Sequence, residues 1–392
     1  MQCPPSSNKP AFAPRATRRA RGFTLIELMI GMLIGLLASL AVTQVMVNSE
    51  GQKRTTTSGS DAQVNGALAL STLQRAIQPA GYGIAANPVA IGCSLTATIG
   101  GAAIAGFPAT LAPVTISQGA AGAPDTIRVL ASGKTSYSVP LRVVSPGYNP
   151  ASPTLSTGFP VTSARSVAGP TTDASGNVII PGDLMVAVIS TSQPCEMFQV
   201  TSNVGTNPVI PRVDNTKWNA TGKPAAIYGE GNFLVNMGQM IDQTYSIGTS
   251  TLQVKSLNIA NDSTPTYPAA TELFPNIVNI KAMYGKDTNA DGVVDVWDNT
   301  TPTTNAGWLQ VLAIRLAVVS RSTQYEKEAV TTANPQWDVG TAITVNDQTP
   351  APVVCGTSKC LTLKVDTPSD WTHYRYKVFE TVIPLRNMIW NS

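Results

Sequence analysis

One uninterrupted apolar segment near the amino terminus, residues 23–47, constrains the fold more than any other feature. This segment of 25 residues contains a single charged residue, Glu27. At ~1.5 Å per residue a helix of this length would extend ~37 Å, which exceeds the ~30 Å hydrocarbon core of a membrane. We therefore expect residues 23–47 to span a membrane and the rest of the chain to fold outside it.

The positive charge of the chain is confined to its amino-terminal end. The 392 residues include 26 Lys+Arg and 23 Asp+Glu, and five of the cations precede residue 22. Without that stretch 21 cations face 23 anions, so no basic surface for nucleic acid is predicted. A basic flank stays in the cytoplasm as a rule, which would place residues 48–392 outside the cytoplasm, across that membrane.

The composition excludes most catalytic chemistry. The only histidine is His373. A single imidazole cannot serve both a Ser-His-Asp triad and a second site, and it cannot form a zinc site with two or three imidazoles. No GxSxG, P-loop or GxGxxG motif is present. We expect a non-enzymatic protein, with 43% apolar residues available for a core.

The junction before the apolar segment, Arg21-Gly22-Phe23-Thr24-Leu25-Ile26-Glu27, resembles the class III leader of type IV pilins and type II secretion pseudopilins. The resemblance implies that a prepilin peptidase removes residues 1–22 by cutting between Gly22 and Phe23. It also implies N-methylation of Phe23, with Glu27 as the fifth mature residue. An ordinary secretory signal differs, because its cleavage site follows the apolar region.

Glu27 is the candidate assembly residue. A carboxylate within an apolar span is costly, and such groups usually serve a function. By resemblance, its partner is the methylated amino group of Phe23 in a neighbouring subunit. The alternative is an interfacial Glu tolerated in a simple anchor helix.

A second helical pattern follows the membrane segment. Val64, Leu68, Leu70, Leu73 and Ile77 recur at roughly helical spacing, and Pro79 and Gly81 follow. These residues predict one helix over 24–78, whose amphipathic part, residues 48–78, packs on the head.

Residues 79–392 are expected to form a β-rich head, giving an α+β fold with a long amino-terminal helix on antiparallel sheets. Short apolar runs alternate with Gly-, Pro-, Ser-, Thr- and Asn-rich connections. The sequence favours strands at 126–130, 183–190, 251–259, 276–284, 309–319, 361–366 and 374–383. Segments 96–125 and 145–182 are poor in charge and are predicted to be surface insertions.

Four cysteines remain after removal of the leader: Cys93, Cys195, Cys355 and Cys360. An even number outside the cytoplasm favours two disulfides, for which three pairings exist. Loop-closure entropy favours Cys355–Cys360, which leaves Cys93–Cys195 as the second bond. A four-cysteine metal site is disfavoured because no C-x₂-C pair occurs.

Residues 287–298 align with a twelve-position calcium loop. Oxygen ligands for structural Ca²⁺ would come from side chains and one backbone carbonyl, namely Asp287, Asn289, Asp291, Val293, Asp295 and Asp298. Position 12 is Asp rather than Glu, and the flanks lack helical signals. The alternative is a β-hairpin whose Asp-Gly forms a tight turn.

The carboxy-terminal run from His373 to Met388 completes a resemblance to PilW-type minor pilins. Ala80-Gly81-Tyr82-Gly83 and the strand Trp308–Leu316 also resemble that family. A nucleic-acid face on the Tyr/Arg alternation is the alternative, and His373 is interpreted as a strand-edge residue.

The resemblance implies a subunit that takes part in initiating type IV pilus assembly or in a tip complex. Implied partners are other minor pilins, the major pilin, the prepilin peptidase, the inner membrane and the pilus assembly platform. After assembly the subunit would lie in the pilus at the cell surface. A type II secretion pseudopilin and a tip adhesin are the alternatives.

Overall fold

The computed structural model describes residues 22–135, 137–204, 208–259, 264–341, 343–344 and 352–389. Two compact units divide the chain, one ending at Thr56 and the other running from Thr57 to Ser392. Residues 1–21, which hold nearly all of the predicted leader, lie outside the described part.

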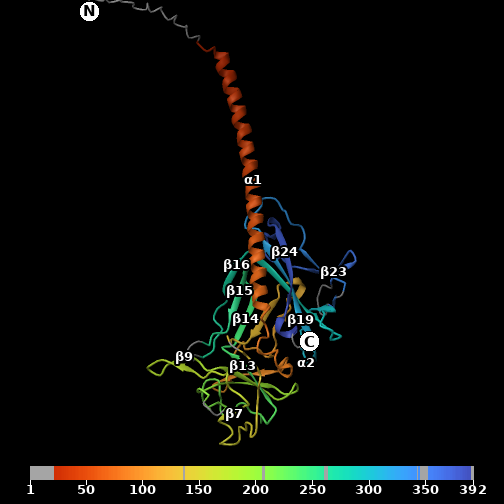
Figure 1. Ribbon diagram of the computed structural model, residues 1–392. Coiled ribbons are helices and arrows are strands. Elements are labelled where there is room, and N and C mark those ends of the chain that lie inside the picture. The colour runs from red at the N-terminus through yellow and green to blue at the C-terminus, as the bar shows by residue number, and fades with distance from the viewer. Residues whose placement is uncertain are drawn as a thin grey trace, which may run out of the picture. The chain divides into compact units, whose positions relative to one another are not determined.

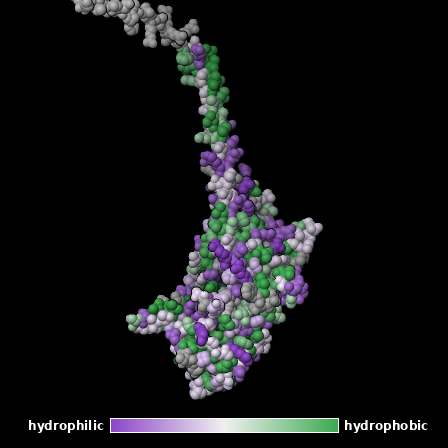
Figure 2. Space-filling model, viewed as in Figure 1, coloured by the Kyte–Doolittle hydropathy of each residue, from purple (hydrophilic) through white to green (hydrophobic). Residues whose placement is uncertain are grey.

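Helix α1 covers Leu25–Ile77, 53 residues, and agrees with the predicted range of 24–78 to within one residue at each end. Its portion Leu25–Lys53 is long and apolar enough to cross a membrane, judged by length and composition. Figure 2 shows this portion as a mostly hydrophobic rod followed by a hydrophilic stretch. The side chains of residues 25–50 are exposed, as an apolar helix requires if lipid is its solvent.

The carboxy-terminal part of α1 packs on the head through small residues. The buried positions Ala62, Ala69, Leu73 and Ile77 follow helical spacing. Gly66 lies on the same face, where an added Cβ would lie only 2.3 Å from the ring of Phe379. The absence of a side chain at Gly66 therefore lets the helix approach the sheet closely.

The predicted apolar face of this helix was wrong in part. Val64 and Leu68 are 53% and 46% exposed, while Leu73 and Ile77 are fully buried. The helix has turned its small residues inward, because the rings and branched chains of the sheet fill the space that larger helix residues would need.

Three sheets of five strands form most of the head (Figure 1). The first has the order β1 (Leu95–Thr96), β11 (Cys195–Gln199), β10 (Leu184–Val188), β13 (Phe233–Gly238) and β6 (Leu141–Arg142). The second has the order β16 (Thr271–Pro275), β15 (Thr251–Ser256), β14 (Ile241–Ile247), β5 (Thr126–Ala131) and β4 (Val114–Ser117). The third has the order β21 (Ile343–Thr344), β18 (Val296–Asp298), β17 (Ile277–Lys286), β19 (Val311–Arg321) and β24 (Tyr376–Pro384).

Smaller sheets and short helices complete the described head. A three-stranded sheet joins β20 (Gln336–Gly340), β23 (Ser358–Thr362) and β22 (Val353–Cys355). Two-stranded pairs are β12 (Val209–Pro211) with β7 (Gly158–Pro160), β2 (Thr98–Ile99) with β3 (Ala102–Ala103), and β8 (Thr171–Thr172) with β9 (Val178–Ile180). The helices are η1 (Pro88–Ala90), η2 (Ala120–Gly122), α2 (Asn305–Leu309), η4 (Trp371–His373) and α3 (Arg386–Ile389).

Strand β19 organises the main core, as its sequence predicts. Ile314, Leu316 and Val318 are fully buried in the cluster that also holds Leu73 and Ile77 of α1. The strand lies between β17 and β24 with antiparallel neighbours on both sides, and Figure 1 shows β19 and β24 beside the lower part of α1. Alternation of β-branched residues on a pleated strand suits such a central position.

The two segments predicted as surface insertions contribute buried residues. Leu111, Val114 and Ile116 belong to the main core. Tyr148 and Phe159 stack with ring centroids 4.2 Å apart in a second core. The prediction was wrong there, because these short runs are buried by pairing with other strands, β4 with the following β5 and β7 with the distant β12, rather than through their own sequence pattern.

Both disulfides favoured by the sequence are present. Cys93–Cys195 joins the segment that follows α1 to β11, across a separation of 102 residues. Cys355–Cys360 closes the hairpin of β22 and β23 across five residues. One bond therefore connects distant parts of the head, and the other fixes a local turn.

Candidate functional site

The amino terminus of α1 is held by a reciprocal cap. The hydroxyl of Thr24 accepts a hydrogen bond from the backbone N–H of Glu27 at 3.2 Å. In return the Glu27 carboxylate accepts from the Thr24 backbone N–H at 3.3 Å and from its hydroxyl at 3.2 Å. This is a capping box, which satisfies N–H groups that have no partner in the first helical turn.

The predicted processing residues lie directly before this cap. Phe23 is 85% exposed, and Gly22 precedes it outside any helix. Glu27 thus carries a negative charge one turn from the point where cleavage would create a new amino group. The T-x-x-E signature of this cap, from Thr24 to Glu27, is readable in the sequence.

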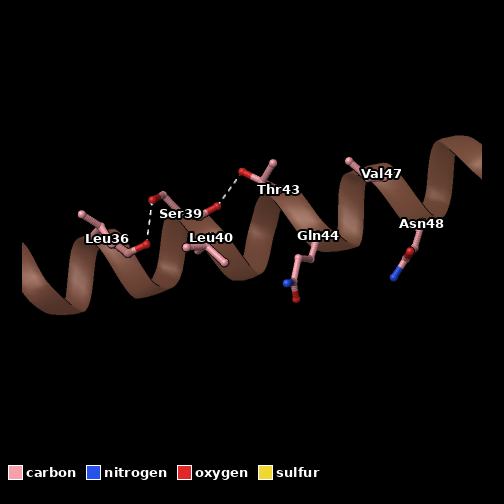
Figure 3. Close-up of a pocket in the computed structure, with 7 residues that line it drawn as sticks. All are labelled: Leu36, Ser39, Leu40, Thr43, Gln44, Val47 and Asn48. Atoms are coloured by element: carbon pink, nitrogen blue, oxygen red, sulfur yellow. Dashed lines mark hydrogen bonds between the residues drawn. The ribbon is translucent and has the colours of Figure 1, made fainter.

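The polar residues within the membrane portion of α1 are partly satisfied by the helix itself. The Ser39 hydroxyl donates to the Leu36 carbonyl at 2.8 Å, and the Thr43 hydroxyl donates to the Ser39 carbonyl at 2.7 Å. Figure 3 shows both bonds beside Leu40, Gln44, Val47 and Asn48, which line the same shallow groove. Hydroxyls bonded to their own backbone can lie in lipid at low cost.

The predicted calcium loop begins at the end of β17 with a buried acid. The Asp287 side chain is 4% exposed. Its Oδ1 accepts from the backbone N–H of Ala290 at 2.6 Å, and its Oδ2 accepts from that of Gly292 at 2.7 Å. Gly292 has φ +83°, a conformation that glycine adopts without strain. The backbone of residues 287–292 therefore turns tightly around the Asp287 carboxylate.

Three further predicted ligands gather on the exposed side of this turn. The Asn289 amide donates to Asp291 at 3.2 Å and to Asp295 at 3.5 Å. Asp295 also accepts from the backbone N–H and the hydroxyl of Thr288, at 2.7 and 2.8 Å. These hydrogen bonds hold the pKa of Asp295 below its usual value, so the group stays ionised.

The last predicted ligand lies apart from this group. Asp298 belongs to β18, and its carboxylate pairs with Lys286 Nζ at 2.5 Å and accepts from the Thr300 backbone N–H at 2.7 Å. Val293 lies in the loop, with an exposed side chain. Hydrogen bonds of Asn289 thus link Asp287, Asp291 and Asp295 within one loop, but the three carboxylates do not all lie within 4.8 Å of one another, and Asp298 is engaged with a strand lysine.

The carboxy-terminal Tyr/Arg run is a strand edge with local partners. Arg375 forms an ion pair with Glu326 at 2.5 Å. The guanidinium of Arg321 lies over the ring of Tyr374, 4.3 Å from the ring centroid. His373 precedes β24 as the last residue of η4 and stacks on Tyr325, so its interpretation as a strand-edge residue was wrong. The aromatic residues pack against the head.

Two family models match the chain. Residues 17–43 match the prokaryotic N-terminal methylation motif, which contains Gly22, Phe23 and Glu27. Residues 244–387 match the type IV pilus-assembly protein W family, from β14 to α3. The chain is therefore similar to the PilW family over the carboxy-terminal part of its head, and it carries an N-terminal methylation motif. Its predicted fold class is confirmed by the long apolar helix and the antiparallel β-rich head.

Comparison with solved structures gives a distant likeness. The type IV-like pilin TTHA1219 from Thermus thermophilus shares 8% identity, with 83% of this chain and 96% of that chain covered and a TM-score of 0.29. The similarity to the PilW family therefore comes from the two sequence models alone. No protein with a curated description matches the chain.

The match to a pilus-assembly family indicates the general nature of the protein. PilW-family proteins are structural components of pili, so the chain is not an enzyme. The methylation motif and the apolar part of α1 indicate membrane anchoring. Its interactions are therefore with other pilins and the pilus machinery.

Proposed function

We propose that the chain is a minor pilin that takes part in initiating type IV pilus assembly or in the complex at the pilus tip. The observation that supports this role is the combination, in one chain, of a methylation motif at 17–43 and a PilW head at 244–387. The prepilin peptidase would cut between Gly22 and Phe23. The assembly platform would then move the anchored subunit from the inner membrane into a filament with other minor pilins and the major pilin.

Glu27 is the residue on which this proposal depends. In the single chain its carboxylate caps the helix that it belongs to, through Thr24. In a filament it would meet the methylated amino group of Phe23 from a neighbour, so that both charges leave the membrane as a pair. Breaking such a buried pair costs ~3–5 kcal/mol, enough to fix the axial register of a subunit.

Two substitutions separate the two uses of this carboxylate. Thr24→Val removes the hydroxyl partner but keeps the charge of Glu27, whereas Glu27→Gln keeps the size and removes the charge. We expect Glu27→Gln to fail to restore pili in a deletion strain and Thr24→Val to restore them. Equal failure of both variants at matched protein levels would mean that Glu27 acts only as a helix cap.

The role in initiation is tested by surface piliation after deletion of the gene, with and without the retraction motor. We expect pili to be lost and partly recovered when retraction is disabled, because an initiator lowers a barrier that slow spontaneous assembly can still cross. Normal pili with lost adhesion would contradict the initiation role and favour a tip adhesin. Normal pili with defective exoprotein release would contradict the initiation role and favour a type II secretion pseudopilin.

We also propose that the loop at 287–295 binds Ca²⁺ through Asp287, Asn289, Asp291, the Val293 carbonyl and Asp295. All of these donors are oxygen atoms, the ligand type that Ca²⁺ prefers, and Gly292 makes the sharp turn that such a loop requires. Asp298 would join only by leaving Lys286. The ion would stiffen the loop between β17 and β18.

Calcium binding is tested by titration of the full chain in detergent micelles. We expect a dissociation constant on the order of 10⁻⁴ M, typical of extracellular modules, and its loss in Asp291→Asn. Asp173→Asn is a matched control, because Asp173 also caps an exposed turn through its carboxylate. Equal binding by the wild type and Asp291→Asn would contradict the proposed ligand set.

A further inference from the structure

A cleft of about 360 Å³ lies where four elements of the head meet. Its walls come from the β14–β15 turn, the start of β17, the end of β19 and the start of β24, and a segment after β23 closes it. Its apolar lining includes Ile247, Val278 and Val365, and its polar lining includes Ser250, Arg321 and Lys364. This volume is at the lower end of the range for small-molecule sites, so a compact ligand would fit.

Arg321 is the unusual group in this cleft. Its guanidinium packs on the ring of Tyr374, and its Nε is buried without a hydrogen-bond partner. No carboxylate of the described residues lies within 4.0 Å of it. Other arginines of the head differ, since Arg128 and Arg375 each pair with an acid at 2.5 Å. A half-buried guanidinium that lacks an anion is costly, and an anion bound in the cleft would compensate its charge.

The second cation of the cleft is Lys364. Its ammonium lies 4.0 Å from Asp366, at the limit of an ion pair, and its side chain is 41% exposed. No acidic residue is among the residues that line the cleft. Asp366 offsets one of the two positive charges, which leaves about one charge for a ligand to neutralise. That balance fits a monovalent carboxylate better than a phosphate dianion.

The lining specifies the rest of the ligand. Aliphatic side chains and the ring of Tyr376 cover most of the wall, and the polar lining includes the two cations and the Ser250 hydroxyl. We propose that this cleft binds a carboxylate carried on a compact apolar group. Arg321 would form charge-assisted hydrogen bonds to the carboxylate, and the aliphatic wall would bury the apolar part. Such a group occurs in two sources, the carboxyl terminus of a peptide segment and a small free organic acid.

Calorimetric titration of the full chain in detergent micelles tests this assignment. The first probes are N-acetyl-leucine and N-acetyl-leucinamide, which differ only in the carboxylate. We expect the acid to bind at least ~10-fold more tightly than the amide, as charge-assisted hydrogen bonds to a guanidinium imply. Equal affinities, absence of binding by both, or equal binding of inorganic phosphate would overturn the proposal.

Three variants locate the binding. Arg321→Gln should weaken N-acetyl-leucine binding at least ~10-fold, and Lys364→Gln, which removes an exposed cation, by only a few-fold. Arg165→Gln is the control, because Arg165 is an exposed arginine in a different cleft. Unchanged affinity in both Arg321→Gln and Lys364→Gln, or an equal loss in Arg165→Gln, would refute the site. If Arg321→Gln does not fold, the Lys364→Gln result and the acid–amide comparison decide.

A last comparison distinguishes the two sources. The tripeptide N-acetyl-Ala-Ala-Leu has the same terminal carboxylate on a longer chain. Tighter binding of the tripeptide than of N-acetyl-leucine would assign the cleft to a peptide terminus. Equal or weaker binding of the tripeptide would assign it to a free acid. This result is independent of the pilus assays, so failure here leaves the assembly role unaffected.

Discussion

The two disulfides offer a quantitative test of how the head is held together. Removing Cys93–Cys195 by a double substitution to alanine opens a loop of 102 residues, whereas removing Cys355–Cys360 opens one of five. In the chain-entropy model a disulfide stabilises by limiting the unfolded chain, by ~4.7 kcal/mol for a loop of ~100 residues and ~2 kcal/mol for five. The long-range bond should therefore contribute about 2.7 kcal/mol more than the short one.

The packing of the sulfur atoms adds to the same difference. Cys93 and Cys195 are 2% and 0% exposed within the main core, so alanine at both sites leaves small cavities. In the short bond Cys360 is buried but Cys355 is only half-buried, so removal of this pair leaves less unfilled space. The predicted order of stability is wild type, then the variant without the short bond, then the variant without the long bond.

Urea unfolding of the full chain in detergent micelles, followed by tryptophan fluorescence, measures this order. With an m-value of ~3 kcal/mol/M the midpoint should fall by ~1.5 M without Cys93–Cys195 and by ~0.7 M without Cys355–Cys360. Equal shifts, or a larger shift for the short bond, would refute the argument that the long-range bond holds distant segments together.

Three further predictions concern the core. Gly66→Leu should lower the urea midpoint of the full chain by the equivalent of ~1–3 kcal/mol, because its side chain would meet the Phe379 ring, and Gly66→Leu with Phe379→Ala should recover part of that loss. Lys281→Met leaves the fully buried Asp125 without its ion-pair partner, and should cost ~3–5 kcal/mol in the same assay. Burial raises the pKa of Tyr284 to about 12, so the folded state keeps a proton that the unfolded state loses above pH 10, and ~1.4 kcal/mol of stability should disappear between pH 9 and pH 11. In Tyr284→Phe the loss of unfolding free energy between pH 9 and pH 11 should be smaller by that amount. The same loss in Tyr284→Phe and in the wild type would contradict a raised pKa of Tyr284.

Local sequence patterns predicted the parts of the fold that depend on local physics. The apolar run and the stop at Pro79 are enough to define α1, because helix formation depends on neighbouring residues. The alternation in 309–319 likewise identified β19. The disulfide pairing followed from loop closure, which depends only on separation along the chain.

Features set by distant contacts could not be predicted in this way. Val64 and Leu68 have the spacing of a buried face, yet the position of Phe379 makes Gly66 the residue that faces the sheet. Phe159 lies in a segment rich in Gly, Pro and Ser, and only the aromatic stack with Tyr148 and Phe198 makes it core. Arg321 lies just beyond the predicted strand 309–319 and has no distinguishing sequence signal, because its missing partner is visible only in three dimensions.

The central claim is that the chain is processed and assembled as a pilin, and the mass of its mature amino terminus tests this most directly. The protein would be purified from the membrane of a bacterium that has the prepilin peptidase, and its amino-terminal peptide analysed by mass spectrometry. The account predicts a peptide that begins with N-methylated Phe23, with Glu27 as its fifth residue. An intact Gly22–Phe23 bond in the membrane-bound protein would contradict the claim and leave a plain membrane-anchored domain.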